Sequence, residues 1–302
     1  MAGTLQKPDA AQRTVGVIGL GLMGGAMAGN LVAGGWRVVG YDIDAKAIAA
    51  ARRKGIEVVE DAAAVAAAAS DIITSLPSAR AAIATAETIA ASARTGLVVM
   101  EMSTLSLDDK ETFAARLTAK GHIALDCPLS GTGAQAETKD LVVYASGNSR
   151  EIERLAPLFL GLGRRYFDLG AYGNATKMKF VANLLVAIHN VASAEAMVLG
   201  MKAGLAPHQI VDVIAAGAGT SRVFELRAPL MADNRYEPAS MRCSIWQKDM
   251  AVIGAFAASL GCPTPLFSAT EPIYRSGLEH GHGAHDTASV CAVLENMAGL
   301  KR

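Results

Sequence analysis

A glycine turn near the N-terminus constrains the fold of this 302-residue chain more than any other feature. Residues 15–24 read Val-Gly-Val-Ile-Gly-Leu-Gly-Leu-Met-Gly, so a short β-branched run ends in Gly19, Gly21 and Gly24 with the spacing G-x-G-x-x-G. An apolar, helix-forming stretch follows, and this order predicts a strand, a tight turn and a helix N-terminus. There, backbone N–H groups and the positive end of the helix dipole favour a pyrophosphate. We expect Gly19 to permit the turn, Gly21 to let a ligand approach, and Gly24 to let helix and strand pack closely.

An acidic residue, Asp42, follows the second apolar run, residues 37–41. It stands about 20 residues beyond the glycines, where a carboxylate accepts hydrogen bonds from the adenosine ribose of a dinucleotide. Such a carboxylate would repel a 2′-phosphate, and residues 43–45 contain no arginine to hold one, so NAD is favoured over NADP. Lys46 is near enough to weaken this preference. The alternative is that Asp42 is an ordinary turn residue at a strand end.

The balance of charge argues against several classes of partner. The chain has 28 Lys and Arg residues against 28 Asp and Glu residues, and its isoelectric point is near 7.0. Because no long basic run appears, nucleic acid and anionic membranes are poor candidate partners, and a small-molecule substrate fits better. The length allows two domains of ordinary size.

Cysteine usage and the N-terminal segment indicate a cytoplasmic protein. The four cysteines form no C-x-x-C pair and have no series of histidines nearby, so we expect a reducing compartment and no metal site. We expect no transmembrane helix. Residues 1–13 are polar and lack the apolar core of a signal peptide, which predicts a disordered tail. The cysteines are Cys127, Cys243, Cys262 and Cys291.

Strands alternate with helices over residues 14–173, which predicts a parallel sheet covered on both faces, a Rossmann domain. From residue 174 to residue 201 a helical pattern runs without a turn signal, and the rest of the chain reads almost wholly helical. The predicted fold class is therefore α/β: an N-terminal Rossmann domain joined by a long helix to an all-helical domain, residues 174–302, for substrate binding and oligomerisation. The expected strands are residues 15–18, 37–41, 57–59, 71–75, 97–100, 123–125 and 141–145.

Three loops, residues 76–78, 102–104 and 127–133, follow the carboxyl ends of expected strands, where such sheets bind ligands. The last loop contains Ser130 and two glycines, which can present a hydroxyl and backbone N–H groups to a carboxylate. The alternative is a glycine-rich loop that merely turns the chain.

Lys179 and Asn183 are the strongest candidates for chemistry. Four residues apart on the long helix, they lie on one face, near the helix start and the carboxyl edge of the sheet. A lysine with its ordinary pKa of about 10.4 is too basic to accept an alcohol proton readily. Burial and the positive end of the helix would lower that pKa. Lys177 faces elsewhere, toward solvent. The alternative is a solvated lysine with an asparagine one turn further on.

Two other sites are weaker candidates. Lys248 and Asp249 are adjacent, and paired charges on a helix usually form a solvated face. Asp286 precedes Thr-Ala-Ser, a position where an isolated aspartate is usually an N-cap.

Five motifs resemble those of the β-hydroxyacid dehydrogenases, in the same order and over nearly the whole chain. That family includes 3-hydroxyisobutyrate dehydrogenase and tartronate semialdehyde reductase, and five ordered motifs are far more specific than any one alone. The motifs are Gly-Leu-Gly-Leu-Met-Gly-Gly-Ala-Met-Ala-Gly-Asn-Leu (19–31), Met-Ser-Thr (102–104), Asp-Cys-Pro-Leu-Ser-Gly-Thr (126–132), Gly-Asn-Ala-Thr-Lys-Met-Lys-Phe-Val-Ala-Asn (173–183) and Lys-Asp-Met (248–250).

The resemblance implies an oxidoreductase that transfers a hydride reversibly between NAD(P) and a small hydroxy acid or semialdehyde acid, in a homodimer or homotetramer. Lys179 matches the family's catalytic lysine, a general acid/base, and Asn183 its substrate-orienting asparagine. The expected substrate-binding residues are Ser130, Gly131, Thr132, Asn183 and Asp286. The expected cofactor-binding residues are Gly19, Leu20, Gly21, Leu22, Met23, Gly24, Asp42, Leu76, Pro77, Thr104 and Lys248.

The chain departs from the family pattern at Thr132, because the substrate loop commonly reads Ser-Gly-Gly. If that backbone needs a positive φ angle, a β-branched residue would be strained there. Either the loop is reshaped, or the Thr132 hydroxyl contacts a more polar substrate. The second interpretation favours a polyhydroxylated acid such as threonate or glycerate over 3-hydroxyisobutyrate.

Two other functions are compatible with this architecture. Imine reductases share it, but commonly carry aspartate or tyrosine where Lys179 stands. A non-catalytic scaffold would tend to lose the lysine and gain basic or linker segments, and this chain does neither. An NAD-binding sensor would bind the dinucleotide tightly without oxidising any hydroxy acid.

Overall fold

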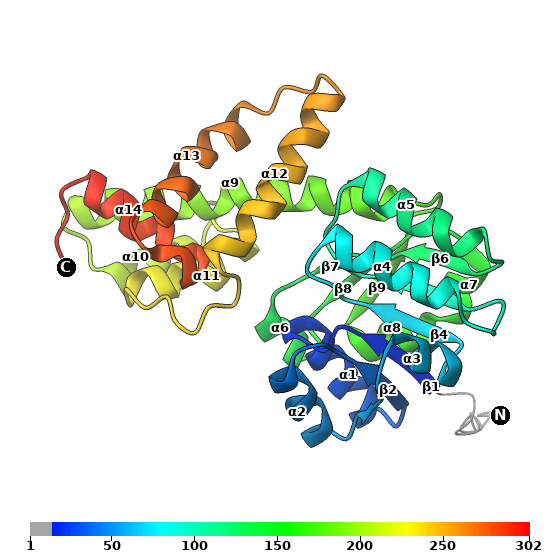
Figure 1. Ribbon diagram of the computed structural model, residues 1–302. Coiled ribbons are helices and arrows are strands. Elements are labelled where there is room, and N and C mark those ends of the chain that lie inside the picture. The colour runs from blue at the N-terminus through cyan, green and yellow to red at the C-terminus, as the bar shows by residue number, and fades with distance from the viewer. Residues whose placement is uncertain (1–13) are drawn as a thin grey trace, which may run out of the picture. The chain divides into compact units, whose positions relative to one another are not determined.

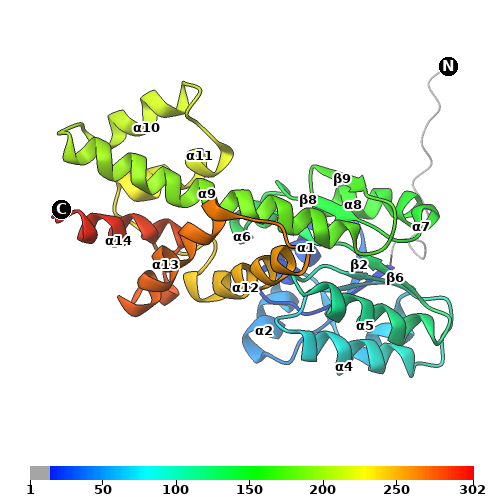
Figure 2. The same ribbon diagram turned by 90° about the horizontal axis from the view of Figure 1, so that it is seen from above.

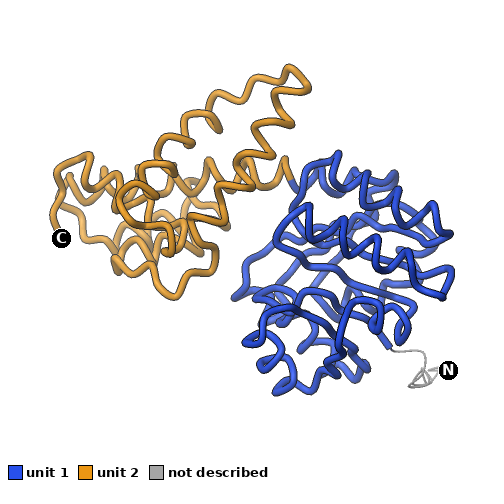
Figure 3. The backbone as a smooth tube through the Cα atoms, viewed as in Figure 1, with its two compact units in different colours: residues 1–179 blue, residues 180–302 orange. Residues whose placement is uncertain are grey.

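The computed structural model describes residues 14–302, and the tail expected at residues 1–13 lies outside the described residues. The chain divides into two compact units, the first ending at Lys179 and the second running from Phe180 to Arg302 (Figure 3). One helix, α9 (Asn174–Lys202), continues through this boundary. The first unit therefore includes the beginning of α9, up to Lys179 itself.

A six-stranded parallel sheet forms the centre of the first unit (Figure 1). The strand order is β3-β2-β1-β4-β5-β6, so β1 and β4 flank the point at which the order of strands reverses. Open sheets of this kind bind ligands beyond the strand ends at that point. The strands are β1 (Thr14–Ile18), β2 (Arg37–Tyr41), β3 (Glu57–Val58), β4 (Asp71–Thr74), β5 (Val98–Glu101) and β6 (Ile123–Asp126).

Helices cover both faces of the sheet, as the alternating pattern predicts. The helices of this unit before α9 are α1 (Leu22–Ala33), α2 (Ala45–Arg53), α3 (Ala62–Ala68), α4 (Ala79–Ala90), α5 (Leu107–Thr118), α6 (Gly133–Glu137), α7 (Ser149–Arg154) and α8 (Ala156–Leu162). Neighbouring residues of a strand point to opposite faces. Ile72 therefore belongs to a core with residues of α3, α4 and α5, whereas Ile73 belongs to a core with residues of α1 and α8. Figure 2 shows α4 and α5 on one side of the strands and α8 on the other.

The strand expected at residues 141–145 does not belong to the parallel sheet. It forms β8 (Val142–Ala145), which pairs antiparallel with β7 (Leu129–Ser130) and parallel with β9 (Arg165–Asp168) in a separate three-stranded sheet. An isolated bridge between Asp126 and Ser146 connects it to the end of β6. Alternating hydrophobicity identified β8 as a strand but could not identify its neighbours. β7 has only two residues and β9 no fully buried one, so neither carries a recognisable strand pattern.

The regular secondary structure of the second unit is entirely helical, as expected. After the remainder of α9 it contains α10 (Pro207–Ala215), α11 (Arg222–Ala232), α12 (Cys243–Ser259), α13 (Pro265–Glu279) and α14 (Val290–Met297). Two short 3-10 turns, His282–Ala284 and Thr287–Ser289, precede α14. Each segment between these helices contains a glycine or a proline.

By length and composition α9 could cross a membrane, contrary to the expectation that no stretch would qualify. However, 44% of its qualifying segment is buried within the protein, and core helices of soluble proteins pass the same test. The polar residue Asn190 of this helix donates hydrogen bonds of 2.9 Å to the Tyr274 hydroxyl and the Thr287 carbonyl. These contacts are those of a helix packed inside a folded unit.

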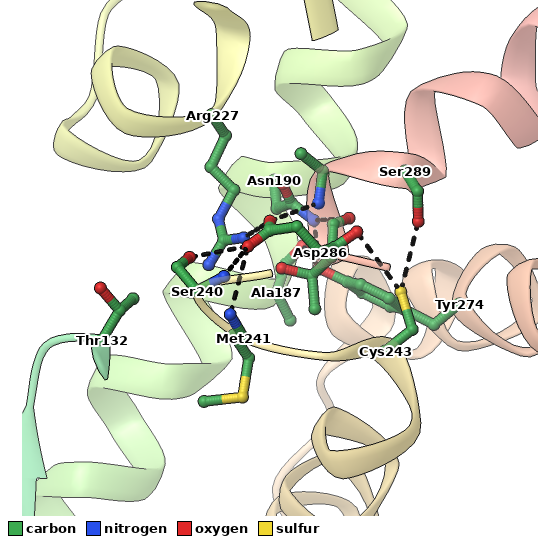
Figure 4. Close-up of polar contacts among 12 residues, drawn as sticks. Thr132, Ala187, Asn190, Arg227, Ser240, Met241, Cys243, Tyr274, Asp286 and Ser289 are labelled. Carbon is green, nitrogen blue, oxygen red and sulfur yellow. Dashed lines mark hydrogen bonds and ion pairs between the residues drawn. The ribbon is translucent and has the colours of Figure 1, made fainter. Parts of the chain in front are cut away.

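A buried ion pair between Arg227 of α11 and Asp286 cross-links the second unit (Figure 4). One Asp286 oxygen also accepts hydrogen bonds from the Ser240 N–H (2.8 Å), the Ser240 hydroxyl (2.7 Å) and the Met241 N–H (3.2 Å). The other accepts the Ala288 N–H (3.0 Å), so Asp286 caps the turn that follows it. The N-cap interpretation of Asp286 is therefore confirmed. The same carboxylate also forms the ion pair with Arg227 of α11.

This environment lowers the pKa of Asp286. Burial by itself raises the pKa, but the charge of Arg227 and the hydrogen bonds from Ala288, Ser240 and Met241 outweigh it. The ionised carboxyl thus stabilises the fold above its unfolded pKa, about 3.9. That stabilisation is lost as the pH falls below 3.9 and through the still lower folded pKa.

We predict that Asp286→Asn lowers the free energy of unfolding of the second unit by about 3 kcal/mol at neutral pH, because Arg227 is left buried without its counter-charge. Toward acid pH, the stability of the variant should fall less steeply than that of the wild type. Trp246 is buried in this unit and Trp36 is half-buried in the other, so urea unfolding followed by fluorescence in a Trp36→Phe background reports on the second unit. Identical pH dependence in variant and wild type would contradict the assignment.

Candidate active site

The three glycines of the turn between β1 and α1 play three different structural roles. Gly19 adopts φ +92°, and a Cβ there would overlap the Ser75 carbonyl oxygen. A Cβ on Gly24 would overlap the Gly19 carbonyl oxygen, so Gly24 allows α1 to pack against the turn. At Gly21, by contrast, no atom of residues 14–302 beyond the adjoining backbone lies within 4 Å of the Cβ position. The space before the Gly21 backbone is open to a ligand.

The N-terminus of α1 has the properties of an anion site. Its N-cap is Gly21, which supplies no capping side chain, and no acidic residue lies in its first turn. The first N–H groups of a helix have no intrahelical partner, and the helix dipole favours negative charge beside them. With the open space at Gly21, the backbone at Leu22 and Met23 fits the pyrophosphate of a dinucleotide. This fit rests on backbone geometry.

Asp42, directly after β2, is held against the glycine turn. One carboxylate oxygen accepts a hydrogen bond of 2.6 Å from the Leu20 N–H, and the other accepts one of 2.8 Å from the Asp44 N–H. The carboxylate is therefore fixed in place at the end of β2. The Leu20 side chain is buried in the core, so only its backbone faces this site. Lys46, which could weaken a preference for NAD, has an exposed side chain.

The loops after β4 and β5 are tied together at the same edge of the sheet. The Ser103 hydroxyl accepts a hydrogen bond of 2.8 Å from the Leu76 N–H, and the Ser103 N–H donates one of 2.9 Å to Glu101. Leu76 and Thr104 are half-buried and Pro77 is exposed. Because Ser75 contacts the glycine turn, the structure brings these three candidates to the carboxyl edge beside Gly19.

The loop after β6 changes direction at Gly131, which adopts φ +136°. Thr132 is extended at φ −102°, so the strain considered for a β-branched residue does not arise. Its hydroxyl accepts the Gln135 N–H (3.5 Å), and its own N–H donates to the Gln135 side-chain oxygen (3.1 Å), forming a capping box at the start of α6. Thr132 therefore has a structural role that needs no substrate. Ser130, the last residue of β7, is half-buried.

The loop after β6 and the glycine turn lie close together, because α6, which follows the loop, packs on α1, which follows the turn. Asn30 of α1 donates a hydrogen bond of 2.7 Å to the Ala136 carbonyl of α6. A Cβ on Gly133 would overlap the Leu22 side chain. Both expected parts of the site in the first unit thus share one surface.

Lys179 occupies a buried position near the start of α9. Its exposed fraction is 8% and that of Asn183 is 5%, whereas Lys177 is exposed and lies 3.4 Å from the Asn174 side-chain oxygen. The spacing argument correctly separated the two lysines, and the alternative of a solvated Lys179 is wrong.

In the second unit, a buried acid orients Asn183. Its side-chain amide donates a hydrogen bond of 3.2 Å to Asp249, which is itself buried. The Lys248 amine lies 3.7 Å from Asp249 and is partly exposed. The expectation of a solvated Lys248–Asp249 pair is therefore wrong for Asp249. Asp286 uses both carboxylate oxygens for protein donors, as described above.

The structure also contains a buried charge cluster that sequence reasoning missed. Lys110 forms ion pairs with Glu101 and Asp126, and all three side chains are fully buried. Lys110 lies in α5 beside acidic residues, which is the usual pattern of a solvated helix face. The only signal in the sequence is its position three residues before Phe113, on the buried face of α5. Among residues 14–302, no group of His, Cys, Asp or Glu side chains is arranged to hold a metal ion.

We predict opposite effects for two alanine substitutions in the glycine turn. Gly24→Ala should lower the free energy of unfolding by about 1–3 kcal/mol, because its methyl group has no space. Gly21→Ala should leave stability within about 1 kcal/mol of the wild type, while weakening NAD binding by filling the open space. Thermal unfolding and calorimetric NAD titration measure the two effects. Undiminished NAD affinity in Gly21→Ala would contradict the assigned site.

Comparisons with known proteins cover both units. Residues 14–173 match the family described as the NAD binding domain of 6-phosphogluconate dehydrogenase, and residues 173–294 match the NAD-binding family of NADP-dependent 3-hydroxyisobutyrate dehydrogenase. The L-threonate dehydrogenase of Escherichia coli O6:H1 is 30% identical over 288 residues, 94% of this chain and 95% of that protein.

Solved structures with the same fold include two kinds of enzyme. A 3-hydroxyisobutyrate dehydrogenase of Mycobacterium tuberculosis, solved with L-serine, has a TM-score of 0.84 and 28% identity over 93% of this chain and 99% of that one. A Streptomyces aurantiacus imine reductase has a TM-score of 0.62 and 19% identity, covering 93% and 99%, a likeness of fold alone. The motifs, the two matched families and the full-length relatives agree: this chain belongs to the β-hydroxyacid dehydrogenases, a family of NAD(P)-dependent hydroxy acid dehydrogenases.

Proposed function

We propose that this protein is an NAD-dependent dehydrogenase of a small, polyhydroxylated acid, with Lys179 as its general acid/base. The observation that carries the proposal is the burial of Lys179, 8% exposed, on a helix that begins in the unit holding the glycine turn. The neighbouring Lys177, by contrast, is exposed. Bound NAD supplies the hydride acceptor for oxidation of the alcohol.

In this proposal Lys179 takes the hydroxyl proton of the substrate during oxidation and returns it during reduction. A positioned proton acceptor of this kind contributes roughly 100- to 10,000-fold in rate. Asn183 orients the substrate through its amide, whose direction is set by the hydrogen bond to Asp249. Lys248, beside Asp249, stays a proposed cofactor contact.

Ser130, Gly131 and Thr132 are the proposed carboxylate-binding loop. The positive φ of Gly131 turns the backbone there, and Ser130 and Thr132 are half-buried beside it. The relatives that are L-threonate dehydrogenases support a C4 polyhydroxy acid as the substrate class. Because the carboxylate of Asp286 is saturated by protein donors, its proposed contribution is to hold the surrounding helices rather than to touch substrate.

The preference for NAD rests on Asp42. Its carboxylate is fixed beside the glycine turn by the N–H groups of Leu20 and Asp44, where it can accept hydrogen bonds from a ribose and would repel a 2′-phosphate. The matched family of the C-terminal part is described as NADP-dependent, so the preference needs a direct test.

A homo-oligomer in the cytoplasm is also part of the proposal. Large apolar side chains of α9 are exposed in the single chain, which supports burial against another copy. They are Met178, Val181, Leu185 and Leu199. Imine reduction is the alternative that the fold allows, and the buried lysine argues against it.

We predict that Lys179→Ala lowers kcat for threonate oxidation by about 100- to 10,000-fold while NAD still binds. Lys177→Ala is the matched control and should turn over normally, because that amine is exposed. Lys179→Arg should stay inactive, since a guanidinium keeps the charge but cannot give up its proton. Steady-state kinetics and calorimetric NAD titration distinguish these cases. A Lys179→Ala enzyme with a near-normal rate would sink the proposal.

We predict that Asp42→Ala shifts the ratio of kcat/KM values for NAD and NADP toward NADP by about tenfold or more, because a repulsive charge is removed. Asp44→Ala, two residues away, removes an exposed carboxylate that caps α2 and should leave the ratio unchanged. An unchanged ratio in Asp42→Ala would show that another residue selects the cofactor.

A further inference from the structure

A single buried ammonium joins the ends of two strands in the first unit. Lys110 of α5 pairs with Glu101, the last residue of β5, and lies 3.0 Å from Asp126, the last residue of β6. It also donates a hydrogen bond of 3.1 Å to the Glu101 carbonyl. All three charged side chains are fully buried. This cluster lies immediately beneath the carboxyl edge of the sheet.

Through Asp126, the cluster holds the start of α9. The Asp126 carboxylate accepts hydrogen bonds from the N–H of Thr176 (2.8 Å) and from its hydroxyl (2.7 Å). Ser146 donates to the same carboxylate (3.3 Å) and accepts the Ala175 N–H (3.1 Å). These bonds satisfy N–H groups of the first turn of α9, which have no intrahelical partner. Lys179 is one helical turn beyond Thr176.

Through Glu101, the cluster holds the loops beside the glycine turn. One Glu101 oxygen accepts the Ser103 N–H, and the Ser103 hydroxyl accepts the Leu76 N–H. A third connection runs from the Tyr172 hydroxyl to the Lys110 carbonyl (2.9 Å), which attaches the turn before α9 to α5. The loops after β4 and β5, the turn before α9 and the first turn of α9 therefore all connect to Lys110.

The amine of Lys110 keeps its charge inside the protein. Burial by itself lowers the pKa of Lys110, but the charges of Glu101 and Asp126 and their hydrogen bonds raise it above its ordinary value. A buried cluster of this kind holds its geometry tightly, because losing one partner would leave Lys110 as an uncompensated charge. An amphipathic helix such as α5 does not need a buried lysine to fold.

We propose that Lys110, Glu101 and Asp126 form a positioning device that sets the location of the Lys179 amine, with the Asp126–Thr176 contact as its arm to α9. The inference rests on the proposed role of Lys179 as the proton acceptor. Lys110, Glu101, Asp126 and Thr176 are positioning residues, because they act through the backbone of α9. A displacement of about 1 Å in a reacting group can cost about 100-fold in rate.

The test uses Thr176→Val, because removing a charged member of the cluster could unfold the protein. Valine has nearly the same shape but lacks the hydroxyl that donates to Asp126, while the backbone N–H contact is kept. Thr176→Ser restores the hydroxyl. Thr88→Val is the matched control, since the hydroxyl of Thr88 on α4 bonds only within its own exposed helix turn among the contacts described.

We expect kcat of Thr176→Val for threonate to fall at least about tenfold, and the NAD dissociation constant to stay within about twofold. Thr176→Ser should recover kcat to within about threefold of the wild type. In the ligand-free protein, amide hydrogen exchange of residues 173–180 should be faster in Thr176→Val than in Thr88→Val or the wild type.

The inference is overturned by a Thr176→Val enzyme with wild-type kcat, by equal losses in kcat and NAD affinity, or by a Thr176→Ser enzyme no better than Thr176→Val. Failure of the proposed function has a different signature. In that case Lys179→Ala itself turns over normally, whereas failure of the present inference leaves Lys179→Ala inactive and Thr176→Val active.

Discussion

The ionic contact between Lys110 and the two carboxylates at the ends of β5 and β6 is the constraint on which, in our proposal, the position of Lys179 depends. Asp126 has two tasks, since the carboxylate that balances Lys110 also caps α9 through Thr176. The helix that carries Lys179 is thereby connected to the strand ends by charge-assisted hydrogen bonds, which are shorter and stronger than neutral ones. Packing alone would exclude water from between helix and sheet, but it would fix the distance between them less specifically.

The glycine turn meets a complementary requirement, the placement of an anion site without charged side chains. Gly19 and Gly24 allow β1, the turn and α1 to approach so closely that a methyl group on either would overlap a carbonyl oxygen. The result is a helix N-terminus with open space before Gly21, bordered by the fixed carboxylate of Asp42. In our proposal, the backbone of the glycine turn binds the dinucleotide and the side chain of Lys179 transfers the proton.

Features encoded locally in the sequence could be predicted well. The glycine spacing identified the turn, and the uninterrupted helical pattern identified α9 with its start at Asn174. The four-residue spacing placed Lys179 and Asn183 on one face, and the two-residue offset placed Lys177 on another. Features that depend on distant partners could not be predicted. Lys110 sits in a segment that reads as a solvated helix, and its partners Glu101 and Asp126 are the last residues of two separate strands. Likewise β7 is too short to be recognised in the sequence. The capping role of Thr132 depends on the loop turning at Gly131 rather than at Thr132 itself.

Chemical rescue of Lys179→Ala by small primary amines tests the central claim most directly, because it asks whether a free amine can replace the missing side chain in proton transfer. We expect added amines to restore NAD reduction by threonate, with second-order rate constants that rise with amine basicity after correction for size. A folded Lys179→Ala protein that binds NAD but gains no activity from any amine would contradict a proton-transfer role for this residue.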